Sequence, residues 1–144
     1  MKKNKIFLII FAILILIAGL VGKIFIELNS TKGKISEVNI IKEESALYSQ
    51  NDINNAIDII LDYFSKNFDG CNLKEISYIG DEQNKNYQDW ANRYNKEEVI
   101  VLISSFETNS SCNGALNPNS GYSNYNWILV RDRNGRWECI DQGY

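Results

Sequence analysis

Residues 49–70, SQNDINNAIDIILDYFSKNFDG, carry the clearest helical pattern in the chain and decide what the rest of the fold has to cover. Apolar side chains recur every three or four residues from Ile53 to Phe68, which places them on one face of a helix. Ser49 followed by Asp52 resembles a capping box in which an aspartate replaces the usual glutamate. Gly70 is typical of the position just beyond a helix C-terminus. The stripe predicts a sheet or a second helix packed on its apolar face.

Four stretches downstream predict the strands of such a sheet. Residues 73–79 alternate imperfectly between apolar and polar, which favours a bulged or curved strand. Residues 99–106, VIVLISSF, are apolar on both faces and predict a central strand. Residues 125–133 and 136–144 flank Asn134-Gly135, a strong signal for a two-residue hairpin turn. That turn sets the register, with the expected opposed pairs Arg131–Glu138, Leu129–Ile140 and Trp127–Gln142.

Two segments separate these strands. Residues 87–94 place aromatics at intervals of three and four, so we expect a short helix there. Residues 107–124 are rich in Asn, Ser and Gly and include the only proline, which predicts a long polar loop.

Residues 6–22, IFLIIFAILILIAGLVG, are an uninterrupted apolar run. A bilayer needs about 20 apolar residues in a helix, and Lys23 can snorkel so that the run extends to Leu28. We therefore expect an N-terminal transmembrane helix or membrane anchor over residues 1–28, a stalk over 29–47 and a domain over 48–144. A cleaved signal peptide is the alternative, and it would make the domain secreted.

Flanking charge predicts the orientation of this segment. Lys2, Lys3 and Lys5 precede the run, which favours a single-pass protein with a cytoplasmic N-terminus and its C-terminal domain outside the cell membrane. Residues 1–35 hold six of the 15 basic and one of the 18 acidic residues, so residues 36–144 hold nine basic and 17 acidic, a net charge of −8. A domain this acidic is repelled by nucleic acid, and no DNA or RNA partner is expected.

The sequence offers few catalytic or metal-binding groups. It has no histidine, the commonest general base and metal ligand at neutral pH. Neither a calcium loop nor a phosphate-binding loop is present, and we expect no metal and no cofactor. Cys71, Cys112 and Cys139 allow one disulfide within a chain outside the cytoplasm, or they are small core residues.

Five stretches together resemble small membrane-anchored or secreted domains of unknown function from Gram-positive bacteria: residues 62–78, 87–94, 99–106, 116–122 and 127–144. The order of elements is similar to that of NTF2-like and cystatin-like folds. The resemblance implies an α+β fold in which a curved antiparallel sheet wraps around a long helix. It implies no reaction, because relatives with such folds include both enzymes and scaffold domains.

A pocket in such a fold lies between the concave face of the sheet and the helices. The residues expected to line it are Tyr78, Trp90, Tyr94, Trp127 and Asp141, and those expected to contact a protein partner are Tyr122 and Tyr125. We expect a binding or scaffold domain without turnover, with the lipid bilayer, through residues 6–28, and a membrane protein as partners. The alternative is a small pocket enzyme in which Asp141 and a tyrosine transfer protons.

Overall fold

The computed structural model describes residues 12–20, 32–112 and 114–144, and the chain divides into two compact units, Met1–Ser30 and Thr31–Tyr144. In the first unit, residues 12–20 form a helix. No helix among the described residues is long and apolar enough to cross a membrane. The transmembrane helix predicted over residues 1–28 is therefore not found among the described residues, which include only residues 12–20 of that prediction. Residues 1–11 and 21–28 of that prediction lie outside the described residues.

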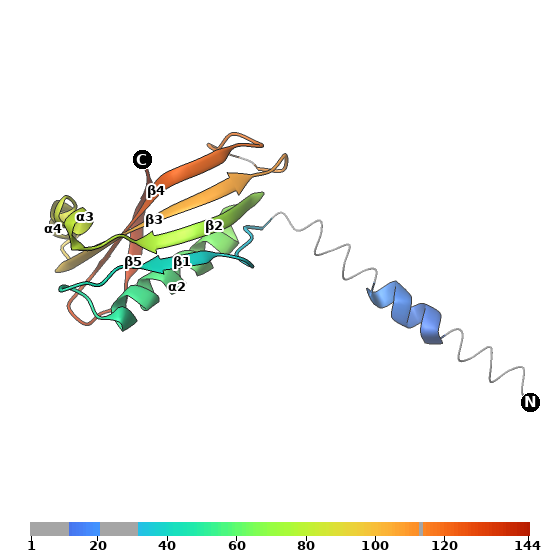
Figure 1. The fold of residues 1–144 in the computed structure, drawn as a ribbon, viewed down its shortest axis with the longest axis horizontal. Helices are drawn as coiled ribbons and strands as arrows, with labels where there is room; N and C mark the ends of the chain where they lie inside the picture. Colours follow the sequence, from blue (N-terminus) through green and yellow to red (C-terminus); the bar gives the residue numbers. More distant parts are fainter. Residues whose placement is uncertain (1–11, 21–31, 113) are drawn as a thin grey trace, which may run out of the picture. The chain divides into compact units, whose positions relative to one another are not determined.

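The second unit is built on a five-stranded sheet (Figure 1). The strands lie in chain order across it: β1 (Asn39–Lys42), β2 (Cys71–Tyr78), β3 (Glu98–Thr108), β4 (Gly121–Arg131) and β5 (Glu138–Gly143). The helices are α2 (Gln50–Asn67), α3 (Asp81–Lys85) and α4 (Gln88–Arg93). The central position predicted for residues 99–106 is confirmed, since β3 lies between β2 and β4.

The sheet is mixed, which corrects the predicted antiparallel sheet. Strand β1 runs parallel to β2, while the other three pairings are antiparallel. The predicted stalk, residues 29–47, therefore contributes a strand to the domain. The sequence signal was weak because all four residues of β1 are exposed, so no alternation of buried and exposed positions marks the strand. Lys34, which precedes β1, adds a further contact with β2, because its backbone N–H donates to the carbonyl of Cys71 at 2.9 Å.

Helix α2 covers one face of the sheet. Its N-terminus has the predicted capping box, in which Ser49 accepts from the backbone of Asp52 and Asp52 accepts from the backbone of Ser49. Its stripe is buried as predicted: Ile53, Ala56, Ile57, Ile60 and Phe64. The sheet supplies Leu73, Ile76, Ile100, Leu102, Phe106, Trp127 and Leu129 to the same core. The irregularity predicted in β2 is a register shift between Leu73 and Glu75.

The final hairpin forms, but residues 132–137 connect its strands in place of the predicted two-residue turn at Asn134-Gly135. The predicted register holds only in part. Trp127 pairs with Gln142 as predicted. An irregularity between Ile128 and Leu129 then shifts the register, so that Leu129 opposes Cys139 and Val130 opposes Glu138. The predicted Leu129–Ile140 and Arg131–Glu138 pairs are therefore wrong.

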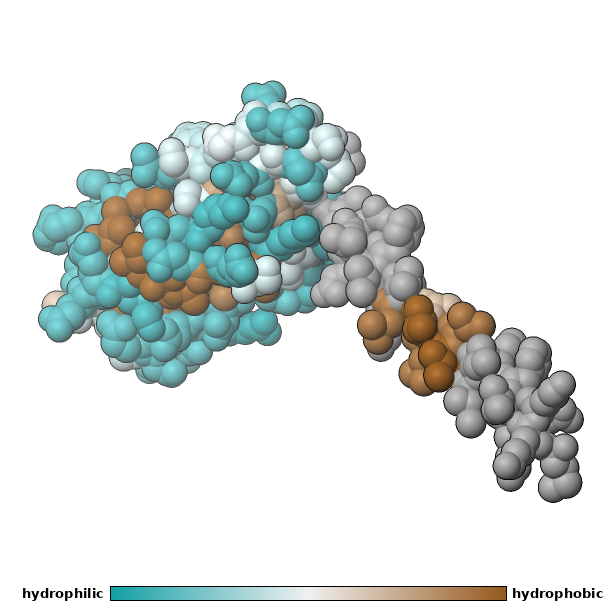
Figure 2. Space-filling model, turned by 45° about the vertical axis from the view of Figure 1, so that its right-hand side comes forward, coloured by the Kyte–Doolittle hydropathy of each residue, from teal (hydrophilic) through white to brown (hydrophobic). Residues whose placement is uncertain are grey.

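Helix α4 lies against the other face of the sheet, and α3 precedes it at the same end of the sheet (Figure 1). A second, smaller core forms there from Ala91, Val99, Ile128 and Val130. The helix predicted over residues 87–94 is confirmed as α4, whereas α3 was not predicted. Apolar residues also reach the surface, where they gather in an area surrounded by hydrophilic ones (Figure 2). On β1, Ile40 and Ile41 are 45% and 41% exposed.

Candidate functional site

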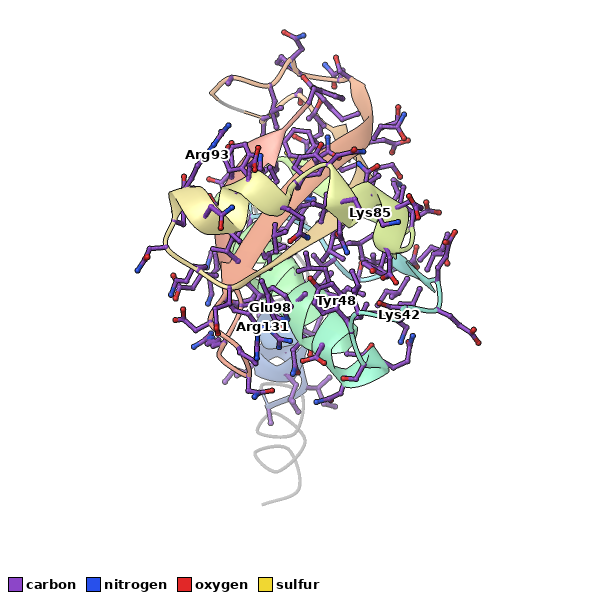
Figure 3. The ribbon with its side chains drawn as sticks, turned by 90° about the vertical axis from the view of Figure 1, so that its left-hand side faces the viewer. Lys42, Tyr48, Lys85, Arg93, Glu98 and Arg131 are labelled. Carbon is purple, nitrogen blue, oxygen red and sulfur yellow. The ribbon has the colours of Figure 1, made fainter. Side chains whose placement is uncertain are left out.

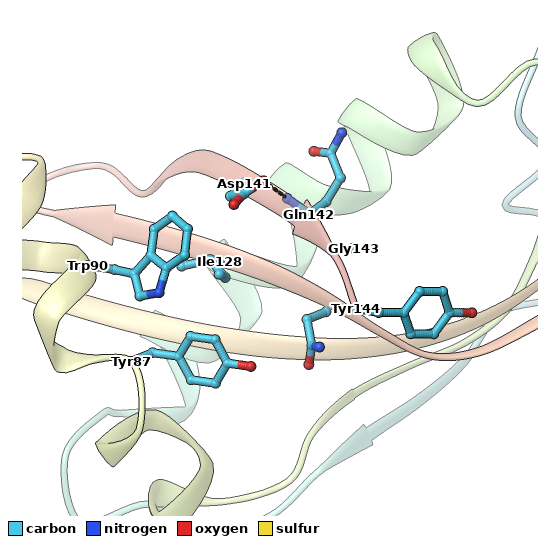
Figure 4. A pocket seen from close by; sticks show the side chains of 8 residues that line it. Tyr87, Trp90, Ile128, Asp141, Gln142, Gly143 and Tyr144 are labelled. Atoms are coloured by element: carbon cyan, nitrogen blue, oxygen red, sulfur yellow. Dashed lines mark hydrogen bonds between the residues drawn. The ribbon is translucent and has the colours of Figure 1, made fainter. Parts of the chain in front are cut away.

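A small pocket lies where α4 meets the middle of β4 and the end of β5 (Figure 4). Its volume is about 110 Å³, and its lining includes Tyr87, Trp90, Asn126, Ile128, Asp141 and Tyr144. Pockets for small molecules and cofactors usually enclose about 300–1,000 Å³. This pocket has room for a side chain rather than for a ligand of that kind.

Helix α4 places the aromatic wall of the pocket. Ala91 packs into the small core and is 3% exposed, which fixes the face that α4 turns toward the sheet. Trp90, next to it, is left half-buried at the pocket. Its ring stacks on Tyr94, with centroids 6.3 Å apart and planes inclined by 11°. The guanidinium of Arg93 lies 5.2 Å from the centroid of the Trp90 ring.

Asp141 supplies the carboxylate of the pocket. It opposes Ile128 in the sheet, so both side chains point to the face that carries α4. The Oδ1 atom accepts a hydrogen bond from the backbone N–H of Gln142 at 2.8 Å. Asp141 is exposed and makes no ion pair with any described residue. Its negative charge is therefore available to an incoming cation.

Two of the predicted pocket residues, Tyr78 and Trp127, lie elsewhere. Both are fully buried in the core beneath α2, on the opposite face of the sheet from Asp141. The indole N–H of Trp127 donates to Ser104 Oγ at 2.8 Å, and its ring centroid lies 5.2 Å from that of Phe68. The structure thus brings Trp90 and Asp141 together at the pocket. It stacks Tyr94 on Trp90 without adding Tyr94 to the lining, and it places Tyr78 and Trp127 apart from them.

The hydroxyl of Tyr78 belongs to a buried hydrogen-bond network. It donates to Asp81 Oδ1 at 2.5 Å and accepts from Asn84 Nδ2 at 3.0 Å. Burial, together with the Asp81 carboxylate, raises the pKa of Tyr78 to about 12. Hydrogen bonds from Ser45 and Tyr78 hold the pKa of Asp81 below its usual value. Tyr78 is therefore protonated at neutral pH and joins β2 to α3 instead of exchanging protons with a substrate.

The tyrosines predicted to contact a partner are packed against the core. Tyr122 stacks on Phe106 with centroids 4.9 Å apart, and its hydroxyl accepts from the backbone of Asn117 at 2.7 Å. Tyr125 is 8% exposed and meets the ring of Tyr144 edge-on at 5.7 Å. The segment between β3 and β4 is also shorter than predicted, since the strands extend to Thr108 and from Gly121.

A wider groove, of about 400 Å³, lies between α2 and the turn that joins β4 to β5. Its walls are the polar outer side of α2 and the exposed residues Asn134 and Arg136. Its one large aromatic, Trp137, is 2% exposed and is covered by Arg131 and Tyr48. The groove therefore offers a ligand almost no aromatic surface, whereas the α4 pocket presents the half-buried ring of Trp90.

Sequence reasoning missed Tyr87, Asn126, Ile128 and Tyr144 as pocket residues. A usable signal was present, because the register that pairs Trp127 with Gln142 also pairs Ile128 with Asp141. Alternation along a strand then places Ile128 and Asp141 on one face and Trp127 on the other.

Comparisons with protein-family models, with curated proteins and with solved structures found no match for this chain. The resemblance to NTF2-like and Gram-positive membrane-anchored domains therefore stays a prediction. Among residues 12–20, 32–112 and 114–144, no group of three or more metal-ligating side chains is placed to hold an ion.

Proposed function

We propose that this chain is a binding protein, without turnover, that works at the outer side of a cell membrane. Its α4 pocket, formed by Tyr87, Trp90, Ile128 and Asp141, takes a lysine or arginine side chain from an extended segment of a membrane-protein partner. The observation that carries the proposal is the meeting of an accessible indole ring and an exposed, unpaired carboxylate in a pocket of about 110 Å³.

The chemistry of the pocket favours a cation. Aromatic faces attract ammonium and guanidinium groups, and Arg93 already lies over the ring of Trp90 in this way. A second cation would gain about 0.5–2 kcal/mol from the aromatic wall and up to about 1 kcal/mol from an exposed carboxylate. The net charge of −8 on residues 36–144 adds long-range attraction for a basic partner.

These contacts are individually weak, so binding depends on where the chain and its partner are held. One pocket of this kind supports binding in the millimolar range at best. Holding two proteins at the same membrane raises their effective concentration and makes such binding sufficient. The apolar residues 6–28 would bring the chain to the lipid bilayer, and Ile13, Leu14, Ile15, Leu16 and Ile17 are between 50% and 70% exposed.

The alternative of proton transfer by Asp141 and a tyrosine is less well supported. Tyr78 lies on the other face of the sheet, and the pocket is too small to enclose a substrate of ordinary size. The described geometry therefore favours recognition over turnover.

Tryptophan fluorescence tests the proposal, because Trp90 is the only half-exposed tryptophan of the three, with Trp127 and Trp137 at 0% and 2% exposure. The full chain in mild detergent is titrated with a lysine-rich peptide and with a glutamate-rich peptide of equal length. We expect the tryptophan fluorescence to change and saturate with the lysine-rich peptide only. Asp141→Asn should bind that peptide at least fivefold more weakly, and Trp90→Phe should show no change in fluorescence.

Asp89→Asn is the matched control. Asp89 is exposed on the same helix as Trp90 but does not line the pocket, so its loss removes the same charge without changing the site. Equal weakening by both Asn variants would mean that only the overall charge attracts the peptide, and the proposed pocket would be wrong.

A further inference from the structure

Cys71 and Cys112 lie side by side although 41 positions separate them in the chain. Their Sγ atoms are 4.0 Å apart, and the residues are 2% and 5% exposed. Cys71 begins β2, and Cys112 lies in the segment between β3 and β4. That segment returns to the start of β2 because the first residue of β2 opposes Thr108, the last residue of β3.

The backbones that carry the two cysteines are held together by more than the sulfur contact. Asn109 donates its N–H to the carbonyl of Gly70 at 2.8 Å, and Cys112 donates its N–H to the carbonyl of Asn109 at 3.2 Å. Gly70 has a φ of +72°, and a Cβ added there would lie 2.5 Å from the backbone nitrogen of Cys112. Only glycine allows this close approach, so the positions of both cysteines are set by their surroundings.

We propose that Cys71 and Cys112 form a disulfide bond that fastens the β3–β4 segment to the start of β2. An S–S bond measures about 2.05 Å, so the two sulfurs must move closer by about 2 Å, a displacement that side-chain rotation supplies when the backbones are already in contact. The proposal is independent of the α4 pocket and of any partner.

The oxidant is a disulfide of low molecular weight, such as oxidised glutathione, or the disulfide of a thiol oxidoreductase. One cysteine thiolate attacks it, forming a mixed disulfide and releasing one thiol. The second cysteine then attacks the sulfur of the first and releases the other thiol. Two protein thiols are thus oxidised to one disulfide, and the oxidant is reduced to two thiols.

Burial decides when the bond forms. It raises the pKa of Cys71 to about 12, with a smaller contribution from Cys112, so little reactive thiolate exists in the folded, reduced protein. The bond therefore forms faster during folding than afterwards. Once formed, it is shielded from reductants by the same burial.

Mass spectrometry tests the bond directly, because trypsin places each cysteine on its own peptide: residues 67–74, 97–131 and 137–144. The full chain is refolded in a buffer of reduced and oxidised glutathione and digested without reduction. We expect a mass 2 Da below that of the reduced chain and a cross-linked pair of peptides 67–74 and 97–131. A pair that contains 137–144, a dimer linked between chains, or three remaining thiols would overturn the proposal.

Thermal unfolding supplies a second readout. A bond that closes a loop of this length should raise Tm by on the order of 10 °C. Dithiothreitol should therefore lower the Tm of the oxidised wild type and of Cys139→Ala equally, and should leave that of the Cys71→Ala/Cys112→Ala double variant unchanged. An equal Tm before and after reduction of the wild type would count against a fastening role.

Discussion

Arg131 of β4 donates from Nη1 to Asp52 Oδ1 at the start of α2, at a distance of 2.6 Å. The same guanidinium donates from Nε to Glu98 of β3 at 2.5 Å (Figure 3). It also lies 4.1 Å from the ring centroid of Trp137. The Arg131 side chain is 7% exposed, while its two carboxylate partners are about a quarter exposed. This cluster joins the first turn of α2 to the start of β3 and to the end of β4.

Replacing Arg131 by methionine should destabilise the fold by about 3 kcal/mol, because two carboxylates lose their shared partner and Trp137 loses its cation. The measurement is urea denaturation at pH 7 followed by circular dichroism. Arg133→Met is the matched control, since Arg133 is exposed and its side chain makes no described interaction, and it should change the stability by less than about 0.5 kcal/mol. Equal effects of the two substitutions would show that the cluster does not stabilise the fold.

Stability should fall as the pH drops below about 4. The hydrogen bond from Ser49, followed by that from Arg131, holds the pKa of Asp52 below its usual value, and Ser45 and Tyr78 do the same for Asp81. Because the folded pKa lies below the unfolded one, the contribution is complete above about pH 4 and is lost as the pH falls through the lowered pKa. We expect Tm to decline between about pH 4 and pH 2.5, and to decline less steeply in Asp52→Asn. A parallel decline in both proteins would exclude Asp52 as a source of the effect.

Asn84 should be the most sensitive position in α3. It is fully buried, its Oδ1 accepts from the backbone N–H of Val101 at 2.8 Å, and its Nδ2 donates to Tyr78. Asn84→Ala leaves that N–H without a partner and should cost about 2–4 kcal/mol. Asn86→Ala, at an exposed position two residues on, should cost less than about 1 kcal/mol. Denaturation of the two variants side by side measures the difference.

Local patterns predicted the elements that depend on local interactions. The spacing from Ile53 to Phe64 and the Ser49–Asp52 pair gave α2 and its capping box, because both features depend on residues three or four apart. The apolar run from Val99 predicted the central strand. A strand that is covered on both faces of the sheet needs no polar residues on either face.

Non-local pairing accounts for what was not predicted. Strand β1 has no buried face of its own, and it forms because the edge of β2 offers free backbone groups. The register shift after Ile128 moved Glu138 away from Arg131, whose partners come from α2 and β3. Grouping Trp127 with Asp141 overlooked the alternation of side chains along paired strands, which is a local rule that would have separated them.

The most direct test of the proposed function follows the three indole N–H signals by nuclear magnetic resonance during titration with a lysine-rich peptide. The indoles of Trp127 and Trp137 donate to Ser104 and to the carbonyl of Asp52, whereas that of Trp90 has no described acceptor. We predict that the Trp90 signal and the amide signals of Asp141 and Gln142 shift together and saturate, while the other two indoles stay in place. Shifts confined to the groove between α2 and the β4–β5 turn, or no shift at all, would contradict the account.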